Sequence, residues 1–256
     1  ARLYQLCRVL DDMADGDIEN GYHRLRSIRR EFVTVGEPLD PLMVVFKPFL
    51  HKHHCSPDVV VALIDGLLSD QKPVRIKTET ELLVYAYRVA GTVGILMCDI
   101  LNCHHKNALD HAMDLGIAMQ LTNIARDVIE DGKKNRVYLV NYTKDTLVNI
   151  KKIIYTADTF YNSSFVGIKD IPLSCRFSII VARRVYRQIG NKIFNIKDIN
   201  TYKKSGKIYV SNFGKILQTI FSLFDFIILF FSISKKLDKK YEYNLINEDI
   251  SLDERI

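Results

Sequence analysis

Three oxygen-bearing side chains are spaced four residues apart in the middle of the chain, at Asn123, Asp127 and Asp131. On an α-helix this spacing places them in one row, about 12 Å long at 1.5 Å per residue. The surrounding residues 115–129 are mostly apolar, so burying such a row is costly unless a cation neutralises it. Mg²⁺ binds one or two carboxylates together with substrate phosphates. The row therefore predicts a metal–diphosphate site.

A second acidic pair lies near the start of the chain, where Asp11 and Asp15 are again separated by four residues. On a helix these two carboxylates share one face. A lone pair of this kind is common on solvated helix surfaces and is weak evidence for a metal site. Two such rows in one chain favour the interpretation that metal ions are held between them, with room for a polyphosphate.

Helical periodicity recurs along most of the 256 residues, which include only 12 glycines and 6 prolines. The pattern favours an all-α protein over a β-rich or α/β one. One domain is expected over residues 1–234, followed by a charged, mobile tail over 235–256. Residues 196–207 are expected to form a loop or frayed turn, and Ser56 to cap a helix that begins at Pro57. Helices are expected over 1–15, 18–33, 42–54, 58–69, 78–100, 115–131, 143–166, 172–195 and 216–233.

The predicted helix over 78–100 contains a run of small residues that includes Gly91 and Gly94. Glycine weakens an isolated helix by about 1 kcal/mol relative to alanine. Two glycines three residues apart instead permit the close approach of another backbone or of a ligand, and the spacing alone leaves both open. Tyr85 lies on the same helix, just before the small residues.

The net charge and the cysteine content indicate which binding partners and which cellular compartment to expect. The net charge of +6 comes from basic residues spread over the chain, whereas a nucleic-acid-binding protein would concentrate them in a stripe or a known module. No nucleic-acid partner is expected. Five cysteines without a CxxC pair suggest a reducing, cytoplasmic setting. The first residues contain no signal peptide, and because the chain starts without Met, an N-terminal segment is expected to be missing.

The last predicted helix, 216–233, is almost entirely apolar and just long enough to span a bilayer. Asp225 would then lie near the middle of the membrane, at a cost of about 3 kcal/mol. A core helix or a helix on the membrane surface is therefore favoured over a true span. Peripheral association with the inner face of a membrane is compatible with this helix.

Several motifs together resemble those of the squalene/phytoene synthase family, over roughly residues 1–216. The run Tyr85–Gly94 is similar to the first family signature, and Asp11–Asp15 to the first aspartate-rich motif, with Tyr4 and Arg8 on the same helix. Within the family, the sequence looks closest to the bacterial phytoene synthases. The second signature is matched at Leu115, Gly116, Gln120, Asn123, Ile124, Arg126, Asp127, Asp131, Arg136 and Tyr138.

The resemblance implies a single-domain, all-α isoprenoid-synthase (terpenoid synthase) bundle around a central cavity. It implies Mg²⁺, with Mn²⁺ as an alternative, at Asp11, Asp15, Asn123, Asp127 and Asp131. The four aspartates and Tyr85, beside the reacting carbons, would be the catalytic residues. The implied substrate-binding residues, on the diphosphates or along the prenyl chains, are Tyr4, Arg8, Gln120, Arg126, Tyr186, Lys207, Lys215, Val89, Ala90 and Gly91.

The activity implied is the head-to-head condensation of two geranylgeranyl diphosphates to phytoene through prephytoene diphosphate, the first step of carotenoid synthesis. A C30 condensation of farnesyl diphosphate to squalene, presqualene diphosphate or dehydrosqualene is the first alternative, with NADPH if it is reductive. A non-catalytic assembly protein with the same fold is the second, although the intact acidic rows argue against it. Lys207 stands where relatives tend to have arginine, which keeps the charge but loses the bidentate fork.

Overall fold

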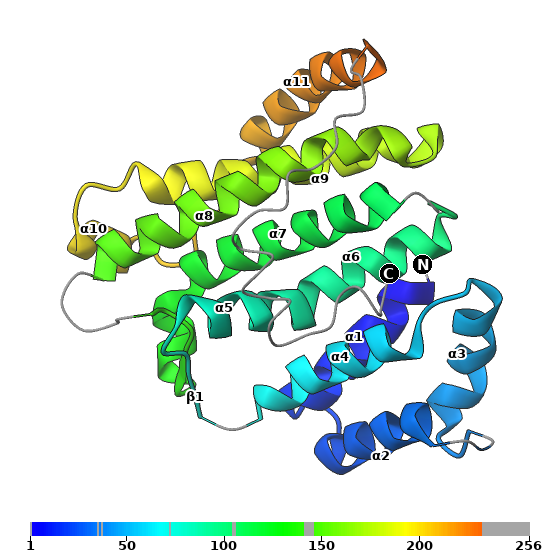
Figure 1. The fold of residues 1–256 in the computed structure, drawn as a ribbon. Coiled ribbons are helices and arrows are strands. Elements are labelled where there is room, and N and C mark those ends of the chain that lie inside the picture. Colours follow the sequence, from blue (N-terminus) through cyan, green and yellow to red (C-terminus); the bar gives the residue numbers. More distant parts are fainter. Residues whose placement is uncertain are drawn as a thin grey trace.

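The computed structural model describes residues 2–34, 36, 38–71, 73–103, 106–140 and 146–231, whose regular elements are helices apart from one short pair of strands (Figure 1). The predicted all-α class is confirmed. The elements are α1 (Arg2–Asp15), α2 (Gly21–Val33), α3 (Pro41–Lys52), α4 (Pro57–Ser69), β1 (Val74–Arg75), α5 (Glu79–Ala86), η1 (Tyr87–Gly91), α6 (Thr92–Ile100), α7 (Lys106–Lys133), β2 (Arg136–Val137), α8 (Thr146–Gly167), η2 (Ile168–Asp170), α9 (Leu173–Phe194), α10 (Ile199–Lys204) and α11 (Asn212–Phe231).

The nine predicted helices are present over the residues that the structure describes, whereas the predicted ends at residue 1, 143–145 and 232–233 lie outside them. Two local predictions were wrong. Residues 199–204 form α10, because the Asp198 carboxylate accepts hydrogen bonds from the Thr201 amide (2.9 Å) and the Thr201 hydroxyl (2.6 Å) and so caps a helix start. Ser56 precedes α4 as expected, yet its side chain makes no capping hydrogen bond. The predicted tail over 235–256, and with it the domain boundary at residue 234, lies outside the described residues.

The longest helix, α7, lies in the middle of the molecule, with α5, η1 and α6 on one side and α8 and α9 on the other (Figure 1). Its buried residues point in several directions: Ile117 and Ala118 lie about 100° apart around the helix, and both are fully enclosed. A helix that is apolar over most of its circumference is stable only inside the fold. This burial fixes the position of the polar row that the same helix contains.

Two glycines allow α7 to cross its neighbour with backbones in contact. A Cβ atom at Gly116 would lie 2.2 Å from the carbonyl oxygen of Ala90, and one at Gly94 would lie 2.2 Å from the carbonyl oxygen of Ala112. Between α5 and α6 the chain forms the π-helical turn η1, the type of irregularity that often occurs at functional sites. Of the two possibilities that the glycine spacing left open, the structure shows close backbone approach.

The two short strands connect loops that are distant in sequence. Strands β1 and β2 are parallel, with Val74 opposite Arg136 and Arg75 opposite Val137. The Val74 amide donates to the Asn135 carbonyl (3.2 Å) and the Ile76 amide to the Val137 carbonyl (2.9 Å). This pairing holds the segment after α4 against the segment after α7, beside the C-terminal end of α1.

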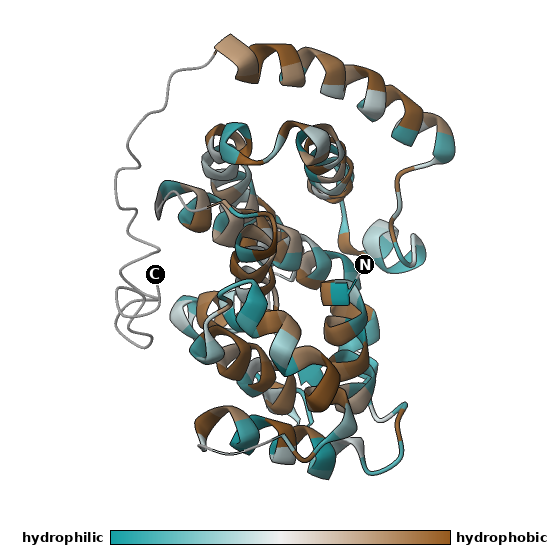
Figure 2. Cartoon of the chain, turned by 90° about the vertical axis from the view of Figure 1, so that its right-hand side faces the viewer, coloured by the Kyte–Doolittle hydropathy of each residue, from teal (hydrophilic) through white to brown (hydrophobic). Residues whose placement is uncertain are grey.

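Helix α11 runs along the edge of the molecule and is predominantly hydrophobic (Figure 2). It packs on α9, where Asp225 accepts a 2.6 Å ion-pair contact from Arg184. Most of its large apolar side chains remain exposed, including Phe224 and Phe231. Two described helical stretches are long and apolar enough to cross a membrane, Glu79–Ile100 and α11; the first is largely enclosed by the protein, and only the second is exposed.

Replacing Gly116 by alanine should destabilise the fold, since the added Cβ would collide with the backbone of η1. Overpacking of this kind costs about 1–3 kcal/mol, which for a protein of this size corresponds to a fall in Tm of roughly 3–10 °C. Differential scanning calorimetry of Gly116→Ala measures the change.

The matched control is Gly190→Ala in α9, where a Cβ would meet only Ile154 methyl groups at 3.4 Å. That variant should keep or slightly raise Tm, because alanine is the better helix former. Equal Tm values for the two variants would contradict the close crossing.

Candidate functional site

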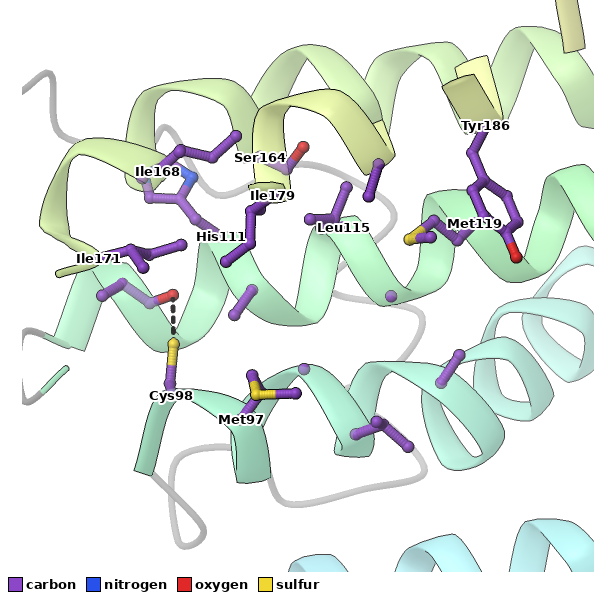
Figure 3. Close-up of a pocket in the computed structure, with 18 of the residues that line it drawn as sticks. Met97, Cys98, His111, Leu115, Met119, Ser164, Ile168, Ile171, Ile179 and Tyr186 are labelled. Carbon is purple, nitrogen blue, oxygen red and sulfur yellow. Dashed lines mark hydrogen bonds between the residues drawn. The ribbon is translucent and has the colours of Figure 1, made fainter. Parts of the chain in front are cut away.

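A cavity of about 440 Å³ lies between η1 and α6, α7, α8 and α9 (Figure 3). The α7 residues in its wall recur every three or four positions, over about 22 Å at 1.5 Å per residue. One face of the helix therefore forms one side of a long, mostly apolar chamber. The α7 residues concerned are Ala108, His111, Ala112, Leu115, Gly116, Met119, Gln120 and Asn123.

The two ends of this cavity differ in chemistry. Ile168, Ile171 and Cys98 close one end, where the Cys98 thiol donates to the Ala108 carbonyl oxygen at 3.6 Å (Figure 3). At the other end lie Gln120, Asn123 and the ring of Tyr186. The shape suits a ligand with a long apolar chain and a polar head.

Asn123 is the residue at which the apolar face of α7 becomes polar. Its side-chain amide donates a long hydrogen bond of 3.5 Å to Gln120 Oε1, whereas its own Oδ1 is buried without a hydrogen-bond partner. One and two turns further on, the same face presents Asp127 and Asp131. The acidic row thus continues the line of cavity-lining residues.

Cationic side chains gather around Asp127. Its carboxylate accepts a bidentate pair of hydrogen bonds from Arg126, at 2.8 and 2.7 Å. Lys207 approaches with its ammonium 3.7 Å from Asp127 and 3.6 Å from Glu130. Lys207 comes from the loop after α10. The Tyr202 hydroxyl holds α10 against α7, because it donates to the carbonyl oxygens of Ala125 (2.7 Å) and Arg126 (3.1 Å).

The acidic row of α1 is compensated in the same way. Arg8 pairs with Asp12 at 2.9 Å and lies 3.7 Å from Asp11. Arg136, which follows α7 in the sequence, donates two hydrogen bonds of 3.1 Å to one carboxylate oxygen of Asp15. The second contact joins the two parts of the chain that contain the predicted rows.

The charge of Arg136 reaches both rows. Burial raises the pKa of Asp11, and Asp15 raises it further, while Arg8 and Arg136 oppose the shift. Burial also raises the pKa of Asp131 to about 6, reinforced by Asp127 and opposed by Arg136. Since one guanidinium acts on carboxylates of α1 and of α7, the two rows converge on the same region of the molecule.

The carboxylate and amide oxygens of the two acidic rows are of the type that a hard divalent cation prefers. Among the residues that the structure describes, no three His, Cys, Asp or Glu side chains are placed to hold one metal ion together. The carboxylates of Asp15 and Asp127 are instead engaged by arginines. A cation bound nearby would compensate both the unpartnered Oδ1 of Asn123 and the raised pKa of Asp131.

The remaining predicted residues occupy different positions. Val89 and Ala90 line the cavity, while Gly91 is buried beside it against Met113 and Ile117. Tyr85 is buried close to these small residues. Three predicted diphosphate-binding residues are exposed: Tyr4 (72%) and Arg8 on α1, and Lys215 in the first turn of α11.

One acidic residue of the site was not predicted. Asp70 follows α4 and accepts hydrogen bonds from the hydroxyls of Tyr85 (2.8 Å) and Tyr138 (2.6 Å). Burial raises the pKa of Asp70, and the two hydroxyls and Arg136 oppose that shift. No local pattern marks Asp70, because its partners are 15 and 68 residues away in the sequence.

An all-α bundle with an apolar cavity leading to acidic rows is the architecture of the isoprenoid synthases. The family model for squalene/phytoene synthase matches residues 1–141. The chain is 33% identical over 222 residues to a phytoene synthase of Pseudescherichia vulneris, covering 75% of this chain and 72% of that relative. It is 32% identical over 216 residues to a 15-cis-phytoene synthase of a Paracoccus strain, covering 75% and 71%. The chain belongs to the squalene/phytoene synthase family, whose members are enzymes of the prenyltransferase type.

Solved structures show the same fold. A dehydrosqualene synthase in complex with a ligand superposes with a TM-score of 0.69 at 24% identity, over 86% of this chain and 83% of that one. A squalene synthase from Alicyclobacillus acidocaldarius superposes with a TM-score of 0.66 at 18% identity, over 74% and 80%. The predicted isoprenoid-synthase fold is therefore confirmed.

Asp131→Asn should stabilise the metal-free protein at neutral pH. A folded-state pKa of about 6 lies above the reference value of 3.8, so ionising Asp131 destabilises the fold as the pH rises through this window. The Tm advantage of the variant should be absent near pH 4, grow up to about pH 6 and then remain constant. Thermal unfolding in the presence of a chelator, between pH 4 and 8, measures it.

Asn123→Ser is the control, because it changes a polar but non-ionising member of the same row. Its Tm difference from the wild type should not vary with pH over this range. A Tm difference for Asp131→Asn that is equally flat would show that Asp131 ionises in the folded protein as it does in the unfolded chain.

Proposed function

We propose that this protein condenses two molecules of geranylgeranyl diphosphate head to head to phytoene, through prephytoene diphosphate, in the first step of carotenoid synthesis. The observation that carries the proposal is the single face of α7 on which an apolar cavity wall passes directly into Asn123, Asp127 and Asp131. A prenyl diphosphate has the same division between chain and head group. The names of the relatives support the C20 substrate.

The polar end of the cavity would bind the diphosphates. Arg8, Arg126 and Lys207 supply positive charge there, and each is at present turned onto a carboxylate. Asp11, Asp15, Asn123, Asp127 and Asp131 would hold Mg²⁺ or Mn²⁺. When bound, the cations supply Lewis-acid stabilisation of the departing pyrophosphate. In their presence the arginines are free to form bidentate contacts with phosphate oxygens.

The apolar part of the cavity would protect a reactive carbocation. Departure of pyrophosphate leaves an allylic cation, which the C2=C3 double bond of the second substrate attacks; loss of a proton then closes a cyclopropane. Water would intercept such a cation, so exclusion of solvent matters. The one thiol in the wall, Cys98, is no competing nucleophile, because burial raises its pKa far above the ordinary range and keeps it protonated.

The alternatives are separable by product. A C30 synthase would use farnesyl diphosphate in the same fold, with NADPH if squalene is the product. An assembly protein of the same fold would form no hydrocarbon at all. The compensated but intact carboxylates of α1 and α7 support an enzyme, since a purely structural subunit has no need of them.

Purified protein with Mg²⁺ should convert radiolabelled geranylgeranyl diphosphate to a C40 hydrocarbon, identified by chromatography and mass spectrometry, and should convert farnesyl diphosphate more slowly. Asp127→Asn, which removes the charge from the centre of the row, should lower kcat at least 100-fold with unchanged helical content. A C30 product from farnesyl diphosphate without a C40 product would replace the phytoene assignment by its C30 alternative. Full activity of Asp127→Asn would remove this residue from the metal site.

We propose further that α11 lies on the cytoplasmic surface of a membrane. Its exposed side includes Phe213, Phe224, Ile228 and Phe231, an apolar surface that an isolated soluble protein seldom presents. Asp225 is turned inward onto Arg184 and does not interrupt this side. A membrane is also the phase into which a C40 hydrocarbon product partitions.

The wild type should float with phospholipid vesicles in a density gradient, and the double variant Phe224→Asp/Ile228→Asp should bind at least 100-fold more weakly, because each buried apolar side chain contributes about 1.5–3 kcal/mol. Leu39→Asp/Val148→Asp is the matched control, since both side chains are exposed but lie outside α11. Equal flotation of the two double variants would exclude α11 as the contact.

A further inference from the structure

Three segments that are distant in the sequence meet at one carboxylate. Each oxygen of Asp70 accepts one phenolic hydrogen bond, Oδ2 from Tyr85 at 2.8 Å and Oδ1 from Tyr138 at 2.6 Å. The two rings are stacked, with centroids 4.6 Å apart and planes inclined by 23°. Both tyrosines are buried. The two hydroxyls are therefore held side by side and directed at the same acceptor.

The position of Asp70 is set by the backbone and not by the tyrosines. Asp70 is the C-cap residue of α4, and its amide donates to the Leu67 carbonyl. The next side chain, Gln71, donates to the backbone carbonyl of Ala14 at the end of α1, and the β1–β2 pairing fixes the segment that follows. The backbone that carries the acceptor is thus held by contacts other than those with the phenols.

A carboxylate can only accept hydrogen bonds, and this fixes where the phenolic protons lie. Burial and the neighbouring carboxylate raise the pKa of Tyr85 and of Tyr138 well above the usual range, so both phenols remain protonated donors. With each O–H directed at Asp70, the lone pairs of each phenolic oxygen face the neighbouring hydroxyl as well as any further partner. Neither hydroxyl is free to donate a proton elsewhere.

The geometry relates this cluster to both chambers of the site. Asp70 forms part of the wall of a second, polar cavity of about 360 Å³, together with Asp15 and Arg136. Tyr85 precedes Val89, which lines the apolar cavity, by one helical turn. The hydroxyl protons therefore point toward the polar cavity that contains the acidic row of α1.

We propose that Asp70 is a positioning residue for the condensation, which orients the hydroxyl protons of Tyr85 and Tyr138 so that their oxygens face the reacting prenyl groups only as acceptors. This assignment rests on the proposed function. The negative ends of two fixed phenol dipoles stabilise a developing allylic cation without solvent reorganisation. Because both phenols stay protonated, neither is a phenolate nucleophile that would capture the cation.

Asp70→Asn tests the assignment, because the amide keeps the shape but presents one N–H donor in place of an acceptor. One phenol must then reverse its hydrogen bond. We expect kcat with geranylgeranyl diphosphate to fall about 10- to 100-fold, as is typical when a supporting hydrogen-bond partner is lost, while KM changes less than about threefold. The fraction of cyclopropyl diphosphate released before the second ionisation should change as well. Asp70→Glu, which retains the carboxylate, should recover part of kcat.

A purely structural role for Asp70 predicts a different result. It would lower Tm and the amount of folded enzyme, but leave kcat per folded molecule and the product ratio unchanged. If Asp70 acts partly through Tyr85, Asp70→Asn should lower kcat by a smaller factor in a Tyr85→Phe background than in the wild type, because members of one catalytic unit are not additive. The matched control is Asp65→Asn on the same helix, where the carboxylate pairs with Arg29 away from the site and activity should be unchanged.

The outcomes separate the two proposals. Normal wild-type turnover, with Asp70→Asn as fast as Asp65→Asn, would overturn the role of Asp70 and leave the proposed function intact. Independent, multiplicative effects of Asp70→Asn and Tyr85→Phe would also overturn it. A wild-type protein that forms no condensed product from either prenyl diphosphate would overturn the proposed function and, with it, this assignment.

Discussion

Carboxylates placed beside an apolar cavity require positive charge nearby, and the organisation of the polar end follows from this constraint. Arg126 and Lys207 balance Asp127, Arg8 balances Asp11 and Asp12, and Arg136 balances Asp15. Partly buried ions without such partners would shift their pKa and lose their charge. The ligand-free state is therefore held by internal ion pairs, and substrate with its cations would exchange these for stronger contacts with phosphate. The arginines would thus pair with carboxylates in the ligand-free protein and with phosphate in the substrate complex.

The apolar part of the site depends on how closely its helices approach. Gly94 and Gly116 bring η1 and α6 against α7 with backbones touching, which places cavity-lining residues of all three elements around one chamber. Tyr186 of α9 and Ser164 of α8 complete the wall from the other side. Small residues at the crossing and larger ones along the wall together determine the width of the cavity.

Much of the fold was predictable because it follows from local pattern. The periodicity of 115–131 and the spacing of Asn123, Asp127 and Asp131 require only a helix, and α7 supplies it. Features that arise from tertiary contacts were not predictable. The role of Asp70 depends on partners 15 and 68 residues away, and the contact between Arg136 and Asp15 spans 121 residues. Helix α10 depends on one capping carboxylate, Asp198, in a stretch without periodicity.

The π-helical turn η1 has a consequence for the geometry of both chambers. A π-turn inserts one residue into an α-helix and thereby advances the phase of everything after it by about 100°. The angle around the helix axis between Tyr85, before the turn, and Gly94, after it, therefore differs from the angle in a regular α-helix. In this way the first part of the segment Glu79–Ile100 can face Asp70 beside the polar cavity, and the second part can line the apolar cavity. The extra residue thus rotates the cavity-lining side chains after η1 relative to the polar side chains before it.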